Sequence, residues 1–138
     1  MIKLSKLTDY AVVVLAQMAQ DKGALLSASV LSERAGLPEP TVSKILKLLG
    51  KAGIIESARG VSGGYRLDKS AENVPVTAII GAIDGPIALT ACVEDSDETC
   101  ALQGVCAMNG RWNPVNRALR AALDNVTLAD MTGGRRAA

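Results

Sequence analysis

The chain has 138 residues, of which 49% are apolar, so a compact domain can form a core without disulfides or metal ions. No run of about 18 apolar residues is present, which excludes a membrane-spanning helix. The net charge of +1 conceals an asymmetry, because residues 1–70 hold ten basic against six acidic residues and residues 71–138 hold five against eight. A basic half followed by an acidic half favours a DNA-reading module joined to a sensing or assembly module.

The first two predicted helices cover residues 7–20 and 28–35. The first has apolar residues at helical spacing, Thr8 as its expected N-cap and Gly23 after its end. The second is expected to begin at Ser27 or Ser29. A tight turn, Gly36-Leu37-Pro38, then leads into a third helix.

The third predicted helix, residues 39–51, has two distinct faces. Its apolar face consists of Val42, Ile45, Leu46 and Leu49. Its opposite face carries the candidate DNA contacts Thr41, Ser43, Lys44, Lys47 and Lys51. Taken alone, these lysines fit the solvated face of any amphipathic helix. The preceding helix, the tight turn and the following hairpin favour a helix that enters the major groove of DNA.

A short hairpin is expected next, with β-like runs at residues 54–57 and 65–67 around a glycine-rich tip. Three helices followed by such a hairpin predict a winged helix-turn-helix domain. The candidate DNA contacts of this wing are Arg59, Ser62, Gly63, Gly64 and Tyr65. Tyr65 has an equally good alternative interpretation, in which it only braces the wing.

The rest of the chain predicts a connecting helix at 76–83, a longer helix from about 112 to 125 and a brief helical turn at 128–131. The expected fold is therefore mainly α with a small β wing, a winged helix-turn-helix domain plus a long C-terminal dimerisation helix. The expected divisions are a DNA-binding domain at 1–75, the connecting helix and cysteine loop at 76–109, the dimerisation helix at 110–132 and a disordered tail at 133–138.

Three cysteines, Cys92, Cys100 and Cys106, lie in a segment without helical or strand periodicity. Thiolates at this spacing can meet at one centre and select zinc, copper(I) or an iron–sulfur cluster. Zinc is disfavoured because the chain has no histidine and no C-x2-C pair. Three free thiols and a thiol–disulfide switch remain alternatives. The nearby carboxylates that could supply a fourth ligand are Glu94, Asp95, Asp97 and Glu98.

Two absences bear on the class of protein. The N-terminal segment lacks the sections of a signal peptide, which predicts a cytoplasmic protein without a membrane partner. With no histidine as general base and no recognisable nucleophile-plus-base arrangement, a cysteine-dependent hydrolase is disfavoured. We therefore expect a protein that is not an enzyme and has no small-molecule substrate.

Specific segments carry a family resemblance, namely KLTDYAVVVL, LSERAGLPEPTVSKILKLLGKAGIIESARG, the SGGYRL wing and the three-cysteine loop. Over about residues 1–130 the chain resembles the IscR, NsrR and RirA family of dimeric winged-helix regulators that carry iron–sulfur clusters. The stretches AGLPEPTVSKILKLL, GPIALTAC and NGRWNPVN look closest to the subgroup that regulates the SUF iron–sulfur assembly operon.

The resemblance implies that the three cysteines hold an iron–sulfur cluster, of the 2Fe-2S or 4Fe-4S type. In the IscR branch a histidine three residues after the last cysteine is the fourth ligand, but Asn109 stands at that position here. In the NsrR branch an aspartate near the start of the first helix reaches across from the other subunit, and Asp9 matches it. Asp9 has an equally good alternative role as a first-turn acid that complements the helix dipole.

The resemblance also implies a homodimer, paired through the C-terminal helix, that binds a pseudo-palindromic operator in double-stranded DNA. The expected function is a transcriptional repressor that senses iron–sulfur cluster status and controls SUF-type assembly genes. The alternatives are a cofactor-free thiol redox-sensing regulator and a cluster-assembly scaffold that does not bind DNA.

Overall fold

The structure is a computed structural model that describes residues 2–133. Residues 134–138, which form most of the tail expected to be disordered, lie outside the described residues. The elements in chain order are α1 (Lys6–Gln20), α2 (Ala28–Ala35), α3 (Glu39–Lys51), β1 (Ile55–Ala58), β2 (Gly64–Leu67), η1 (Ala71–Asn73), α4 (Val76–Asp84), α5 (Asn113–Asp124) and α6 (Leu128–Met131).

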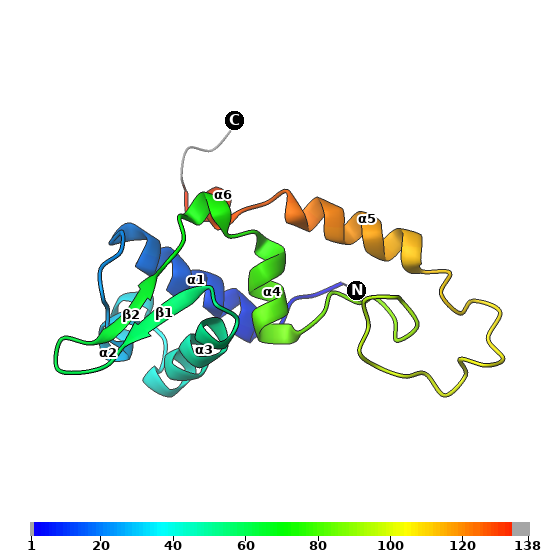
Figure 1. Ribbon diagram of the computed structural model, residues 1–138, viewed down its shortest axis with the longest axis horizontal. Helices are drawn as coiled ribbons and strands as arrows, with labels where there is room; N and C mark the ends of the chain where they lie inside the picture. Colours follow the sequence, from blue (N-terminus) through cyan, green and yellow to red (C-terminus); the bar gives the residue numbers. More distant parts are fainter. Residues whose placement is uncertain (1, 134–138) are drawn as a thin grey trace.

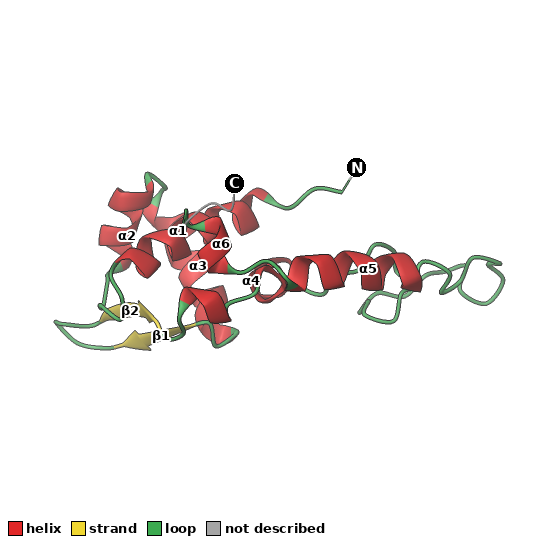
Figure 2. Ribbon diagram, turned by 90° about the horizontal axis from the view of Figure 1, so that it is seen from above, coloured by secondary structure: helices red, strands yellow, loops and turns green. Residues whose placement is uncertain are grey.

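Helices α1 to α4, the β1–β2 wing and α6 gather into one body (Figure 1). Helix α5 and the loop of residues 85–112 project away from this body, as both views show (Figure 2). The predicted fold class, mainly α with a small wing, is confirmed. No helix within residues 2–133 is long and apolar enough to cross a membrane.

The core lies where α1, α3 and α4 pack against one another. The four residues predicted to form the apolar face of α3 are all fully buried. They join one cluster with Val14 and Leu15 of α1 and Ile79 of α4. Burying this face sets the rotation of α3 about its axis, because the 3.6-residue period then directs the opposite face to solvent.

The start of α1 differs from the sequence prediction. Thr8 is not the N-cap, because the helix begins at Lys6 and the Ser5 hydroxyl accepts a hydrogen bond from the Thr8 N–H at 3.1 Å. Thr8 is instead buried, with 1% of its surface exposed. The cap of α2 is as expected, since the Ser27 hydroxyl accepts from the Val30 N–H at 3.1 Å.

The wing is a two-stranded antiparallel hairpin whose register runs from Ile55 opposite Leu67 to Ala58 opposite Gly64. The connector between α1 and α2 also pairs with the wing, along β2. Leu26 and Tyr65 exchange two backbone hydrogen bonds of 2.8 Å. This bridge ties the wing to the helical body.

Two glycines allow close backbone approaches in the wing, one within the hairpin and one against the connector between α1 and α2. A Cβ atom on Gly63 would lie 2.2 Å from the carbonyl oxygen of Ala58, and one on Gly64 would lie 2.8 Å from the carbonyl oxygen of Leu26. Both contacts are with backbone atoms and cannot be relieved by a side-chain rotation. The sequence prediction assigned these glycines to DNA approach, and the structure adds a steric requirement for them.

The chain leaves the body after α4 and returns at residue 127. A bridge between Thr127 and Pro75, which directly precedes α4, fastens the returning segment, and the Leu128 N–H donates to the Val74 carbonyl at 2.8 Å. Leu128, at the start of α6, is fully buried. The short helix expected at 128–131 therefore anchors the end of this excursion.

A core substitution in α3 tests this packing. Leu46→Ala should lower the free energy of unfolding by about 2–5 kcal/mol, because it leaves a cavity in a fully buried cluster. The measurement is urea unfolding followed by circular dichroism, at one fixed protein concentration. Lys47→Ala, one residue along on the exposed face, should change stability by less than about 0.5 kcal/mol. Equal losses in both variants would contradict this orientation of α3.

Candidate functional site

The outward face of α3 is basic. Lys44, Lys47 and Lys51 are exposed, and Thr41 and Ser43 are half-buried near the start of the helix. Within residues 2–133 none of the three lysines forms an ion pair. Their ammonium groups are therefore free for an anionic partner such as a phosphate.

The wing presents a second surface. Arg59 and Ser62 are exposed at the hairpin tip, while Gly63 and Gly64 are half-buried. A groove of about 500 Å³ separates the wing from the start of α2, and its lining residues include Ser27, Arg59 and Tyr65. A groove beside a basic hairpin has space for a phosphate backbone.

Tyr65 has a structural role in the wing. Its backbone forms the bridge to Leu26, and its half-buried side chain packs against the hydrophobic core. This observation favours the bracing interpretation of Tyr65.

The first half of the cysteine loop is attached to α5 through Asn116, the one buried residue that α5 contributes. The Asn116 Oδ1 accepts from the Leu89 N–H at 2.9 Å, and its Nδ2 donates to the Ile87 carbonyl at 2.9 Å. Asn113 adds a bond of 2.8 Å from the Glu94 N–H to its own Oδ1. These bonds hold residues 87–94 along the helix.

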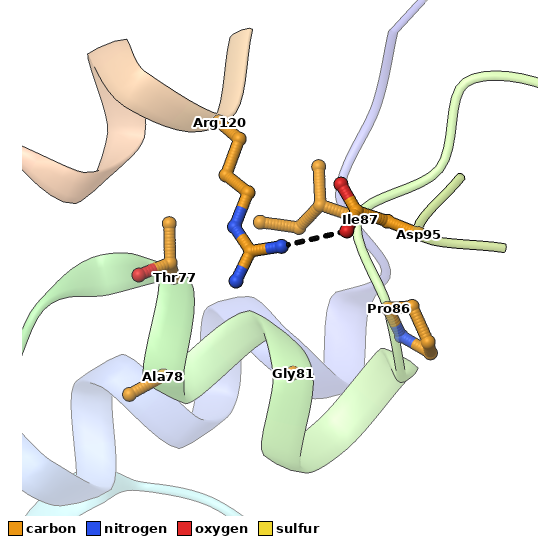
Figure 3. A pocket seen from close by; sticks show the side chains of 7 residues that line it. All are labelled: Thr77, Ala78, Gly81, Pro86, Ile87, Asp95 and Arg120. Atoms are coloured by element: carbon orange, nitrogen blue, oxygen red, sulfur yellow. Dashed lines mark hydrogen bonds and ion pairs between the residues drawn. The ribbon is translucent and has the colours of Figure 1, made fainter. Parts of the chain in front are cut away.

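Two acid–arginine pairs reinforce this attachment. Glu94 pairs with Arg117 through two bonds of 2.6 and 2.8 Å. The hydrogen bond from Arg117 lowers the pKa of the Glu94 carboxyl. Asp95 accepts from Arg120 Nη1 at 3.0 Å, across a groove of about 270 Å³ between α4 and α5 (Figure 3). All four side chains are at least a quarter exposed, so each pair stabilises only weakly on its own.

These pairs reduce the number of nearby carboxylates that are available as a fourth metal ligand. Glu94 and Asp95 are engaged by arginines, so using either as a metal ligand requires an ion pair to break. Asp97 and Glu98 are exposed and lie beyond the attached segment. Asp9 is exposed in the first turn of α1.

The three cysteines lie on both parts of the loop. Cys92 belongs to the attached half, whereas Cys106 lies in residues 101–109, all of which are exposed. Cys100, which is half-buried, immediately precedes that exposed stretch. Residues 2–133 contain no group of three cysteine, aspartate or glutamate side chains close enough to hold one metal ion. The donor chemistry suits a soft metal centre, but the second half of the loop must rearrange to assemble it.

Cys92 is the cysteine with a perturbed environment. The Thr90 hydroxyl lies 3.3 Å from its sulfur. This hydrogen bond, and secondarily the backbone of Gly110, favours the thiolate and lowers the pKa of Cys92. A larger thiolate fraction makes this sulfur the more ready ligand or nucleophile.

The apolar side of α5 is largely uncovered. Val115 is 48% exposed, Ala122 is exposed, and Leu119, Leu123 and Val126 are only partly buried. Polar residues also join α5 to its own chain, for example through a 2.5 Å bond between Thr77 Oγ1 and Asp124 Oδ1. The predicted apolar stripe thus has no complete cover within the described chain.

Several residues that organise the site were not identified from the sequence. They are Ser5, Asp84, Thr90, Asn113, Asn116, Arg117 and Arg120. The only available signal was the placement of asparagine and arginine on the polar side of an amphipathic helix that follows an acidic loop. That pattern also fits a solvated surface, so it could not identify the partners.

Comparisons with known proteins agree on one family. The family model named Rrf2 and described as an iron-dependent transcriptional regulator matches residues 4–134. The transcriptional regulator NsrR of Halalkalibacterium halodurans is 29% identical over 131 residues, which cover 94% of this chain and 90% of the relative.

Two solved structures share the fold, with sequence identities close to that of the NsrR relative. One is CymR of B. subtilis, described as its global cysteine regulator, at 26% identity and a TM-score of 0.72 over 99% of this chain and 100% of that chain. The other is IscR of T. potens, at 30% identity and a TM-score of 0.65 over 94% of this chain and 85% of that chain.

The environment of Cys92 generates a prediction about thiol reactivity. In a variant that retains only Cys92 (Cys100→Ser, Cys106→Ser), alkylation by iodoacetamide should reach its half-maximal rate at a lower pH than free cysteine does, because the depressed pKa populates the thiolate earlier. Adding Thr90→Val should move that midpoint upward. Thr77→Val, a matched change remote from the sulfur, should not move it. Identical midpoints with and without Thr90 would contradict the role of its hydroxyl.

Proposed function

The chain belongs to the Rrf2 family of iron-dependent transcriptional regulators, and from this premise we propose that it is a cluster-sensing repressor of SUF-type iron–sulfur assembly genes. The homologues are transcriptional regulators and not enzymes. The observation that carries the DNA-binding part of the proposal is the free basic face of α3 opposite a fully buried apolar face.

In this proposal α3 lies in the major groove of double-stranded DNA. Thr41, Ser43 and Lys44 face base edges or nearby phosphates, and Lys47 and Lys51 neutralise phosphates further along. Arg59 and Ser62 of the wing approach the neighbouring minor groove, with Gly63, Gly64 and Tyr65 shaping the hairpin. The exposure and lack of ion pairs at the lysines support this arrangement.

A homodimer completes the proposed DNA-binding unit. The uncovered stripe of α5 supports pairing with a second copy, because burial of an aliphatic helix face is the main source of association free energy. A two-fold axis would place two α3 helices about one DNA turn apart and match a pseudo-palindromic operator.

The proposed cofactor is an iron–sulfur cluster held by Cys92, Cys100 and Cys106. A labile cluster would supply a centre whose occupancy depends on iron and oxidants. The chain's contribution is the lowered pKa of Cys92, the exposed segment that brings Cys106, and Asp9 of a second copy as the fourth ligand. Membership of an iron-dependent family supports this assignment.

A cofactor-free thiol sensor is the second candidate, and two observations favour it. Cys92 has a depressed pKa, and one structural relative is a cysteine regulator. In this alternative two thiols lose two hydrogens to an oxidant such as a peroxide and form a disulfide. Membership of a regulator family disfavours a scaffold that does not bind DNA.

Salt dependence tests the role of α3. With an operator selected from a random DNA library, Lys47→Ala should weaken binding and reduce the slope of log affinity against log salt by about 1, the effect of one lost phosphate contact. Lys22→Ala removes the same charge from the connector after α1 and should leave the slope unchanged. Equal effects of the two variants would point to general electrostatics and contradict the assignment of α3.

Anaerobic reconstitution with iron and sulfide tests the cofactor. The wild type should gain visible absorption and bound iron and sulfide, and a triple Cys→Ala variant should gain neither. Asp9→Ala should retain less cluster after gel filtration if Asp9 is a ligand. A colourless wild type whose mass falls by about two hydrogens on mild oxidation would instead establish the thiol sensor.

A further inference from the structure

Asp84 links the start of the cysteine loop to the start of α1. Its carboxylate accepts hydrogen bonds from the Ser5 hydroxyl at 2.8 and 2.9 Å and from the Thr8 hydroxyl at 2.7 Å. These residues are 76 to 79 positions apart in the chain. The contact therefore joins the end of α4 to the start of α1, two segments that are far apart in the sequence.

Asp84 lies at the boundary between α4 and the cysteine loop. It is the last residue of α4, and the chain enters the cysteine loop at the next residue, Gly85, whose φ of 84° favours glycine. Thr8 is buried, so its hydroxyl depends on the bonds with Asp84 and Ser5 to be satisfied. Any displacement of the loop base must break these bonds or carry the first turn of α1 with it.

The helix that begins with this first turn, α1, packs against the DNA-reading helix α3. Further along α1, Val14 and Leu15 are fully buried in the cluster that includes the apolar face of α3. Close-packed side chains transmit a displacement because they leave no space to absorb it. A path of contacts thus runs from the loop base through Asp84 and α1 to α3.

We infer that Asp84 is a positioning residue that couples the state of the cysteine loop to the placement of α1 and α3 on DNA. The inference rests on the proposed cluster-sensing function and names the contact through which the signal passes. Assembly of the thiol site requires the second half of the loop to rearrange, and Asp84 holds the base of the same loop against the DNA-binding domain. Asp84 touches neither DNA nor the cluster in this scheme.

The test compares operator affinities of cluster-loaded and cluster-free protein. Coupling between two sites typically changes affinity about 5- to 150-fold, and this ratio is the quantity measured. In Asp84→Ala the ratio should fall to within about twofold of unity, while the visible spectrum of the loaded protein is retained. Thr8→Val, which removes the hydroxyl and preserves the buried shape, should reduce the ratio in the same direction. The double variant should add little beyond Asp84→Ala, because both changes remove one contact.

Asp21→Ala is the matched control. Asp21 is the C-cap at the other end of α1 and pairs with Arg34 of α2, so the substitution removes an equal charge and a comparable tie to α1. It should shift the affinities of both states equally and leave their ratio unchanged. If Asp21→Ala lowers the affinity ratio as much as Asp84→Ala does, the effect comes from general loosening of α1, and the inference is overturned.

The remaining outcomes separate the inference from the function on which it rests. A wild type whose affinity does not depend on cluster loading contradicts the proposed function itself. A wild type with a clear ratio that Asp84→Ala preserves overturns the role of Asp84 alone. If Asp84→Ala does not fold, Thr8→Val decides the question, since a preserved ratio there equally overturns the inference.

Discussion

The burial of one side of α3 is the constraint from which the rest of the DNA-binding domain follows. Four aliphatic side chains pack against α1 and α4, and no rotation of α3 keeps them buried while hiding Lys44 or Lys47. The hydrophobic effect thus orients a polar surface without any specific contact to that surface. The wing is held to the same body through the bridge between Leu26 and Tyr65, so both candidate DNA surfaces belong to one unit.

The second part of the molecule uses the opposite distribution of residues. Helix α5 turns asparagines and arginines toward its own chain and leaves its aliphatic residues exposed or only partly buried. Asn116 replaces water for two backbone groups of the loop, a task that a hydrophobic residue cannot perform. The loop is therefore ordered near Cys92 by hydrogen bonds, while residues 101–109 have little packing to hold them. The proposed cluster sensor would need both a fixed ligand and a segment that can move, and the loop offers both.

Sequence reasoning predicted the helices, the wing and the inward side of α3, because helical period and turn chemistry are local signals. The prediction of Thr8 as the α1 cap was wrong. Serine and threonine are both good caps, and the contact of Thr8 with the distant Asp84 is not visible in the local sequence. Sequence reasoning identified the cysteines but not the partners of Glu94 and Asp95. Those partners are 23 to 25 residues away on a helix whose polar face resembles any solvated surface.

Outward aliphatic residues on α5 have a consequence for how the cell maintains this protein. Hydrogen bonds exposed to water hold a helix weakly, and much of the stability of α5 would come from the second copy in the proposed dimer. A freshly synthesised chain at low abundance would then carry an incompletely stabilised helix and be open to proteolysis.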